Sequence, residues 1–222
     1  MSPDLTRRRL LGAAGAAGLA IVAGCGGDDD APDAAAPLDE ANSCTVAPEL
    51  TEGPFYFDAD SVRSDIRDDR EGVAMRLTVR VQQAPDCTPV KDAVVSLWHC
   101  DALGSYSESG ERYLRGEQVT DAEGVVEFVT IYPGWYRGRA VHMHLKVFPG
   151  GNAEVTTQLF FDEAFSDSIY EREPYSSVGE RDVRIEGDMV YAEADSEGTP
   201  LMLTLKRDGD EVLAGANIVI AS

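Results

Sequence analysis

The chain has 222 residues, which is long enough for one ordinary domain preceded by an export segment. Hydrophobic residues make up 43% of the chain, so it can form a sizeable core. The formal net charge of −21 argues against nucleic acid as a partner, because binding a phosphate backbone requires a clustered basic face. We take the acidity to favour solubility outside the cell.

Residues 1–24 have the features of an export signal and are not expected to belong to the fold. Residues 6–11 (TRRRLL) are similar to a twin-arginine signal, and the apolar run 10–24 is short for a transmembrane helix. The run ends in residues 22–25 (VAGC), a lipobox-like sequence in which Cys25 would be lipidated. We therefore expect an exported protein at the periplasmic or outer-surface side of the envelope, attached to the membrane only through Cys25. The alternative is a plain signal peptide with a chance cysteine.

Residues 25–42 are rich in Gly, Asp, Ala and Pro and predict a disordered tether, which leaves residues 43–222 for the folded domain. Export makes a disulfide possible. We expect a Cys44–Cys87 bridge, because both cysteines lie in loop-like sequence next to predicted strands, and a buried thiol at Cys100. The sequence alone leaves the pairing open.

The domain has the pattern of an all-β protein, an antiparallel β-sandwich or barrel with few short helices, and we favour the sandwich. Turn signals at residues 85–86, 121–124, 149–151 and 208–209 separate short apolar or alternating segments. Only residues 163–170 have a helical pattern. The expected strands are 73–83, 93–99, 125–132, 141–148, 156–161, 189–192, 201–205 and 218–221.

The chain has three histidines, and His142 and His144 are two residues apart within a predicted strand. Alternation places both imidazoles on one face with Lys146, opposite an apolar face that would pack in the core. Together with Tyr136 and Tyr106, the two imidazoles form a donor set suited to iron(III), because phenolate oxygen favours the ferric state. A purely structural polar face, or a copper or zinc site, are the alternatives.

Five segments in order resemble the intradiol ring-cleavage dioxygenases, in particular exported single-domain members related to the catalytic domain of protocatechuate 3,4-dioxygenase. The resemblance implies one Fe(III) per chain with four ligands, Tyr106, Tyr136, His142 and His144. Tyr106 would stay bound, whereas the catechol would displace Tyr136, which then accepts a proton from it. The segments are 51–56 (TEGPFY), 97–107 (LWHCDALGSYS), 130–136 (TIYPGWY), 139–144 (RAVHMH) and 157–161 (TQLFF).

The resemblance also implies catalytic roles for Arg139 and Gln158. Arg139 would stabilise negative charge on the substrate, and Gln158 would orient Arg139 or a histidine. Without the resemblance, an exposed arginine and a strand-edge glutamine would be the simpler interpretation. His99 is expected to be a hydrogen-bonded residue near the surface, not a ligand. Tyr56 is a candidate pocket wall.

The implied reaction inserts O2 between the two hydroxyl-bearing carbons of a catechol and yields a muconate-type diacid. The alternative function is an exported β-sandwich binding module with a vestigial metal site, because fold alone does not determine function. We find no equivalent of the helical dimerisation region of catechol dioxygenases, so the oligomeric state and the particular catechol stay open.

Overall fold

The computed structural model describes residues 37–38, 44–58, 61–150, 155–197 and 200–222. The predicted signal peptide at 1–24, the expected lipid anchor at Cys25 and nearly all of the tether at 25–42 lie outside these residues. Within the described residues, no helix is long and apolar enough to cross a membrane.

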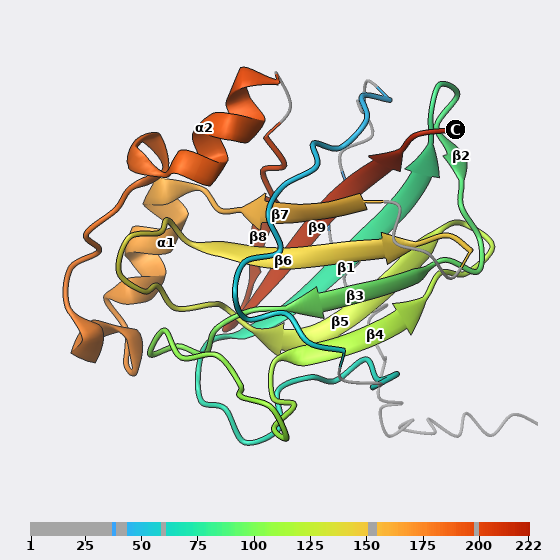
Figure 1. Ribbon diagram of the computed structural model, residues 1–222. Helices are drawn as coiled ribbons and strands as arrows, with labels where there is room; N and C mark the ends of the chain where they lie inside the picture. Colours follow the sequence, from blue (N-terminus) through green and yellow to red (C-terminus); the bar gives the residue numbers. More distant parts are fainter. Residues whose placement is uncertain (1–36, 39–43, 59–60, 151–154, 198–199) are drawn as a thin grey trace, which may run out of the picture. The chain divides into compact units, whose positions relative to one another are not determined.

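Two β-sheets pack face to face (Figure 1), which confirms the predicted sandwich. The first sheet has the order β2-β1-β9-β8, with β5 also paired to β1. Its pairs are antiparallel except that β1 and β9 run parallel. The strands of this sheet are β1 (Ala74–Gln83), β2 (Thr88–Pro89), β5 (Val125–Ile131), β8 (Thr204–Asp208) and β9 (Glu211–Ile220).

The second sheet is antiparallel and has the order β4-β3-β6-β7. Because β3 and β6 are antiparallel, the last residues of β3 and the first residues of β6 lie at the same end of the sheet, beside the helices (Figure 1). The strands are β3 (Val94–Trp98), β4 (Arg115–Val119), β6 (His142–Phe148) and β7 (Val155–Phe160).

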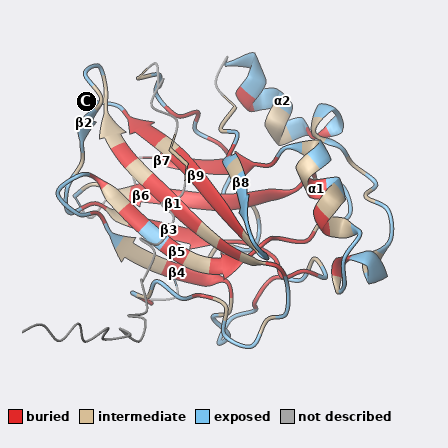
Figure 2. Cartoon of the chain, turned by 180° about the vertical axis from the view of Figure 1, so that it is seen from behind, coloured by how far each residue is buried: buried red, intermediate tan, exposed pale blue. Residues whose placement is uncertain are grey.

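The core lies between the two sheets, and strands β6, β7 and β9 are buried along most of their length (Figure 2). Met75, Leu77 and Val79 of β1 and Leu145 and Val147 of β6 are fully buried in this one cluster. The expected alternation along β6 is therefore confirmed: every second residue enters the core, and the histidines lie on the outer face of the second sheet.

Strand register brings one residue from each of three strands into a row on that outer face. Trp98 of β3 pairs with His144 of β6, and His144 pairs with Gln158 of β7. Residues paired in register share a face and lie about 4.5–5.5 Å apart. The register thus places Gln158 next to a histidine that lies fourteen residues away in the sequence.

The predicted helix at 163–170 is confirmed as α1 (Glu163–Tyr170), but the predicted strand at 189–192 is wrong. Those residues begin helix α2 (Met189–Ser196), whose N-cap is Asp188. The short apolar run is ambiguous by itself, and the preceding aspartate and the following Ala-Glu-Ala-Asp favour the helix. Two 3₁₀ turns, Tyr175–Val178 and Ile185–Gly187, connect α1 to α2.

Two further strand predictions needed adjustment, and strand β4 was missed. The segment expected at 201–205 pairs mainly as β8 (Thr204–Asp208), and the one expected at 218–221 is the end of the longer β9. The polar strand β4, sequence RGEQV, was not predicted, because an edge strand need not carry the apolar pattern of a buried one.

The disulfide prediction is confirmed. Cys44 and Cys87 are bridged, with their Cα atoms 5.4 Å apart, and Cys100 is a buried free thiol. The bridge attaches the start of the described domain to the turn that follows β1.

Candidate metal centre

The two histidines of the predicted site lie at the beginning of β6, buried beneath other aromatic side chains. His142 is 2% and His144 is 1% exposed. The indole of Trp98 stacks on the His144 ring, with centroids 5.0 Å apart and planes inclined by 9°. The β3–β6 register explains this stacking, since the two residues are direct cross-strand partners.

The hydrogen bonding of His142 leaves one ring nitrogen ready to bind a cation. Its Nδ1 lies 2.7 Å from the carbonyl oxygen of Ala140, so Nδ1 carries the proton and Nε2 keeps its lone pair. Burial, followed by the positive charge of Arg139, lowers the pKa of His142 to about 3. Burial also places the pKa of His144 well below its ordinary value, so both imidazoles are neutral at neutral pH.

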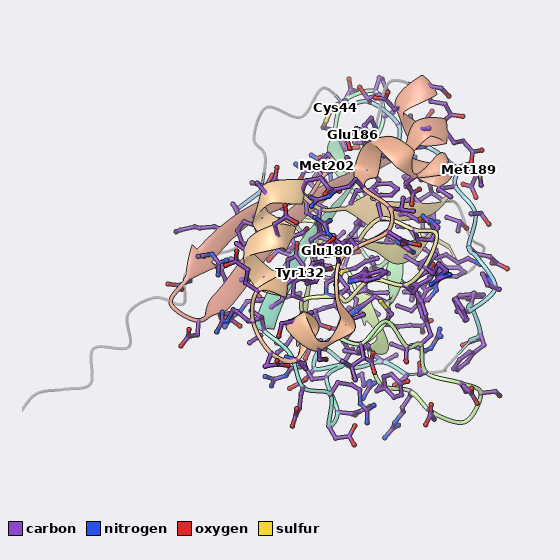
Figure 3. The ribbon with its side chains drawn as sticks, turned by 90° about the vertical axis from the view of Figure 1, so that its left-hand side faces the viewer. Cys44, Tyr132, Glu180, Glu186, Met189 and Met202 are labelled. Atoms are coloured by element: carbon purple, nitrogen blue, oxygen red, sulfur yellow. A yellow bond between two sulfur atoms is a disulfide. The ribbon has the colours of Figure 1, made fainter. Side chains whose placement is uncertain are left out.

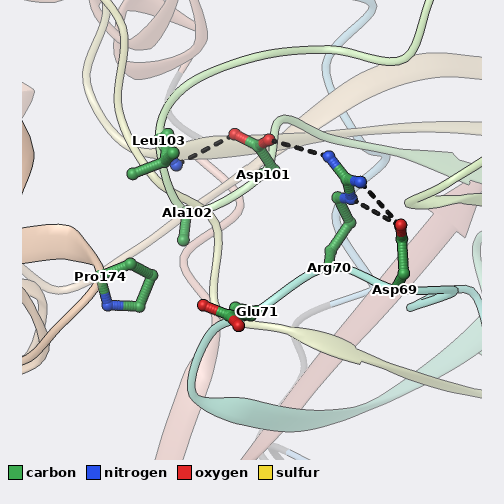
Figure 4. A pocket seen from close by; sticks show the side chains of 7 residues that line it. All are labelled: Asp69, Arg70, Glu71, Asp101, Ala102, Leu103 and Pro174. Carbon is green, nitrogen blue, oxygen red and sulfur yellow. Dashed lines mark hydrogen bonds and ion pairs between the residues drawn. The ribbon is translucent and has the colours of Figure 1, made fainter.

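Tyr106 is presented by a tight turn that follows β3. Asp101 organises this turn, because its carboxylate accepts hydrogen bonds from the backbone amides of Leu103 (3.0 Å) and Ser105 (2.9 Å). Arg70 lies 3.8 Å from the other carboxylate oxygen (Figure 4). The turn ends with the phenol of Tyr106 buried to 8% exposure.

Tyr136 comes from the loop between β5 and β6, which interlocks with the Tyr106 turn through two glycines. A side chain at Gly134 would meet the carbonyl oxygen of Asp101 at 2.5 Å, and Gly104 has a φ of +84° and contacts the backbone of Trp135. Only glycine permits this approach without displacing backbone. The two tyrosine-bearing loops are thus held in fixed relation.

Helix α1 packs against the same loop. Tyr132, at the end of β5, is fully buried beneath this helix, and its hydroxyl lies 2.8 Å from that of Ser166 (Figure 3). Tyr170 donates a hydrogen bond of 2.9 Å to the carbonyl of Pro133. Tyr132 therefore packs in the core.

All four predicted metal-binding side chains converge on a small region around Nε2 of His142. The Nε2 of His144 and the hydroxyl oxygen of Tyr136 each lie 3.2 Å from it, and the hydroxyl oxygen of Tyr106 lies 3.5 Å from it. Ligands about 2.0–2.1 Å from one ion, at angles between octahedral and tetrahedral, are about 2.9–3.4 Å apart. The spacing and the donor set therefore fit one transition-metal ion.

The donor set differs from the usual ferrous oxygenase site of two histidines and one carboxylate. Among the described residues, no group of three or more His, Cys, Asp and Glu side chains is arranged to hold a metal ion. The oxygen donors near the histidines are phenols. Burial raises the pKa of both, that of Tyr106 more strongly. A bound cation would oppose this effect and favour the phenolates.

Arg139 and Gln158, predicted as catalytic, meet beside the histidines. Nη1 of Arg139 lies 3.3 Å from Nε2 of His142, and Nη2 donates a hydrogen bond of 2.6 Å to Oε1 of Gln158. Gln158 is itself held by a hydrogen bond of 2.8 Å from its side-chain amide to the carbonyl of Thr51. Of the two roles expected for Gln158, the geometry supports orienting Arg139.

Asp188 also belongs to this region, although the sequence analysis missed it. Its fully buried carboxylate lies 2.8 Å from Nε of Arg139 and accepts hydrogen bonds from the amides of Ala140 (2.7 Å), Val190 (2.9 Å) and Tyr191 (3.0 Å). Burial would raise the pKa of Asp188, but the hydrogen bond from Arg139, those from the amides of Tyr191 and Ala140, and the positive charge of Arg139 outweigh it and hold the pKa below its ordinary value. The signal in the sequence that could have drawn attention to Asp188 is its position as an N-cap aspartate before a helix.

A cavity of about 660 Å³ opens onto both tyrosines. One wall is the segment 54–57, which confirms Tyr56 as a lining residue, and a second wall is the turn 104–109. Lys146 anchors the first wall, since its ammonium lies 2.5 Å from Glu52 and 3.7 Å from the centre of the Tyr56 ring.

His99 plays no part in this cavity. Its ring nitrogens bond to the carbonyl of Cys100 at 2.8 Å and to the hydroxyl of Thr130 at 2.7 Å, as expected for a residue that is not a ligand. The expectation that it lies near the surface is wrong, because it is fully buried.

Comparison with known proteins places these features in a family. A family model described as Dioxygenase matches residues 47–195. Chlorocatechol 1,2-dioxygenase of Rhodococcus opacus is 27% identical over 145 residues, which cover 54% of this chain and 56% of that protein. This chain spans about half the length of the curated relatives it matches.

Solved structures agree over more of the chain. The intradiol ring-cleavage dioxygenase from Tetranychus urticae has a TM-score of 0.75 and 30% identity, covering 80% of this chain and 95% of that one. The dioxygenase domain of a dioxygenase carbohydrate-binding fusion from Streptomyces sp. SirexAA-E has a TM-score of 0.60 and 26% identity, covering 80% and 98%. With the family model matching well over half of its length, this chain belongs to the intradiol ring-cleavage dioxygenase family.

Proposed function

We propose that this protein is a ferric intradiol dioxygenase. It would insert both atoms of O2 between the hydroxyl-bearing carbons of a catechol, so that catechol and O2 give one muconate-type diacid. The observation that carries the proposal is the convergence of two neutral imidazole nitrogens and two phenol oxygens around Nε2 of His142. The family typically uses ferric iron, and this donor set suits it.

In the proposed site, Tyr106, Tyr136, His142 and His144 hold one Fe(III). When bound, the iron supplies Lewis acidity and a template for the two catechol oxygens and O2. Apart from this metal chemistry, the work is done by the chain's own residues.

The two tyrosines differ in a way that supports different roles. Tyr106 is buried and covered by Phe55, whose ring stacks on it with centroids 4.3 Å apart. Tyr136 is partly exposed on a loop beside the cavity. Tyr136 is therefore the better candidate to be displaced by the substrate, and its phenolate oxygen is placed to accept a catechol proton.

Arg139 supplies a fixed positive charge beside the reacting ring. Asp188 and Gln158 hold its guanidinium, so little reorganisation is needed when negative charge develops on the substrate.

Export and lipid attachment at Cys25 belong to the same proposal, resting on the ordered arginines, apolar run and VAGC sequence. Expression with radiolabelled palmitate should label the wild-type chain and leave Cys25→Ser unlabelled. An unlabelled wild-type chain, cleaved and released, would instead indicate a plain signal peptide.

The function is tested on the aerobically purified domain 43–222 after reconstitution with iron. About one iron per chain, a visible tyrosinate-to-iron charge-transfer band and conversion of catechol to a muconate-type product with uptake of one O2 are expected. Preference for copper or zinc, or a colourless protein that takes up no iron, would contradict the proposal. The colourless outcome would favour a binding module.

A further inference from the structure

The cavity beside the tyrosines is large for the simplest substrate. Its volume of about 660 Å³ falls within the range of about 300–1,000 Å³ typical of sites for drug-sized ligands. Catechol has a single ring and eight non-hydrogen atoms, so it would occupy only a fraction of this space. The remaining volume is available to a substituent on the catechol ring.

The wall formed by segment 54–57 is aromatic and firmly held. Phe55 is 39% exposed, stacks on Tyr106 and meets Tyr136 edge-on at 6.1 Å. Tyr56 packs on Trp98 with centroids 4.9 Å apart. Exposed aromatic rings on a fixed wall favour a flat aromatic substituent, because aromatic pairs attract beyond the area they bury.

The second wall, the turn 104–109, carries the charge. Glu108 is exposed and lines the cavity, together with the hydroxyls of Ser105 and Ser109. Among the described residues, no lysine, arginine or histidine lines the cavity, and Glu108 forms no ion pair. An anionic substituent would therefore meet a carboxylate and find no partner.

The cation that packs against the aromatic wall does not change this conclusion. Arg115 is 3% exposed, and its guanidinium lies 4.0 Å from the centre of the Phe57 ring. It donates hydrogen bonds to the carbonyl of Phe55 at 2.6 Å and to the hydroxyl of Ser107 at 2.6 Å. Its donors thus serve the two walls of the cavity and not its interior.

We propose that the cavity selects uncharged catechols that carry a bulky aromatic substituent, and that Glu108 discriminates against catechols that carry a carboxylate. This inference rests on the proposed function for the identity of the catechol group. It assigns Glu108 to charge selection and Phe55 to recognition of the aromatic substituent.

Binding is measured under argon by calorimetry on the iron-loaded domain, with four probes. Catechol and 4-phenylcatechol differ in the aromatic substituent, whereas 3,4-dihydroxybenzoate and 3,4-dihydroxybenzamide differ mainly in charge. We expect 4-phenylcatechol to bind about three- to tenfold more tightly than catechol. We expect the benzamide to bind about two- to fivefold more tightly than the benzoate, as for an exposed charge pair.

Variants assign the effects to residues. Glu108→Gln should reduce the benzamide-to-benzoate ratio toward one, and comparing the ratio between variants cancels the different acidities of the two catechols. Glu123→Gln is the matched control, because Glu123 is exposed in the turn between β4 and β5, at the end of the sandwich remote from Trp98. Phe55→Ala should weaken 4-phenylcatechol binding more than catechol binding.

Equal binding of the benzoate and benzamide by the wild type, or a ratio unchanged by Glu108→Gln, would overturn the charge selection. Equal binding of catechol and 4-phenylcatechol would overturn the role of the aromatic wall. Oxygen uptake by the same samples separates this inference from the proposed function. If the probes bind in the expected order but no ring is opened, the proposed function is refuted and the inferred selectivity stands. If a ring is opened but the probes bind in the reverse order, the selectivity is refuted and the proposed function stands. Binding of none of the probes refutes both.

Discussion

Replacing Asp188 by alanine is expected to destabilise the domain more than any ordinary loss of a helix cap. The carboxylate is fully buried, and the Arg139 side chain that it pairs with is 17% exposed. Removing one partner of a buried pair leaves the other charge uncompensated, at a cost of about 3–5 kcal/mol. Loss of the cap on α2 belongs to the same change and is worth about 1 kcal/mol by itself. We therefore expect Asp188→Ala to lower the free energy of unfolding by about 3–5 kcal/mol.

Asp162→Ala provides a matched control. Asp162 also caps an eight-residue helix, α1, through a hydrogen bond of 2.7 Å from the amide of Phe165, but it is exposed and makes no ion pair to an active-site arginine. Its replacement should cost about 1 kcal/mol. Urea unfolding of both variants, followed by tryptophan fluorescence, compares the two. If Asp188→Ala cost no more than Asp162→Ala, the assigned role of the ion pair would be wrong.

The same pair gives a pH dependence with a definite sign. The pKa of Asp188 is lower in the folded protein than its ordinary value, so its contribution is present above the unfolded pKa of about 3.9. It is lost as pH falls through the lower, folded pKa. The difference in unfolding free energy between wild type and Asp188→Ala should be constant from pH 7 to pH 5 and should shrink below about pH 4. A difference that grows on acidification would contradict this linkage.

Three other changes test the site and the fold. Tyr106→Phe should abolish iron retention after dialysis, whereas Tyr136→Phe should keep part of it, because the exchangeable ligand is the partly exposed one; equal retention by both would contradict this asymmetry. Gly134→Ala should cost about 1–3 kcal/mol and weaken iron binding, because its methyl group would force the tyrosine loops apart; unchanged metal affinity would argue against the interlock. Replacing Cys44 and Cys87 by serine should lower stability by about 4 kcal/mol, the chain-entropy value for a separation of 43 residues, and a loss below 1 kcal/mol in thermal unfolding would refute that account.

Local sequence patterns were sufficient to predict elements whose conformation depends mainly on their own residues. The alternation in residues 141–148 predicted a half-core strand with both histidines outward, and helix α1 begins and ends at the predicted residues. The short run 189–192 failed because four apolar residues fit either a strand or a helix, and Asp188 resolves the choice only when read as a cap.

Contacts between distant segments could be anticipated only in part. The resemblance identified Tyr106 and Tyr136, but their convergence depends on two loops that interlock at Gly104 and Gly134. The resemblance implied that Gln158 orients Arg139 or a histidine. The register shows how it reaches Arg139, because β7 pairs with β6 so that the glutamine lies on the histidine face.

Residue type and local spacing were enough to predict the periodicity of most strands and the chemistry of the histidine and tyrosine donors, and the resemblance of five segments was enough to predict the family. The tertiary structure was needed to show that Asp188 holds Arg139, that Glu108 and Phe55 line the same cavity, and that β1 pairs in parallel with β9. Each of these contacts joins segments that are far apart in the sequence, so local propensity cannot predict it. The contacts form when the apolar faces of all the elements are buried together in one core.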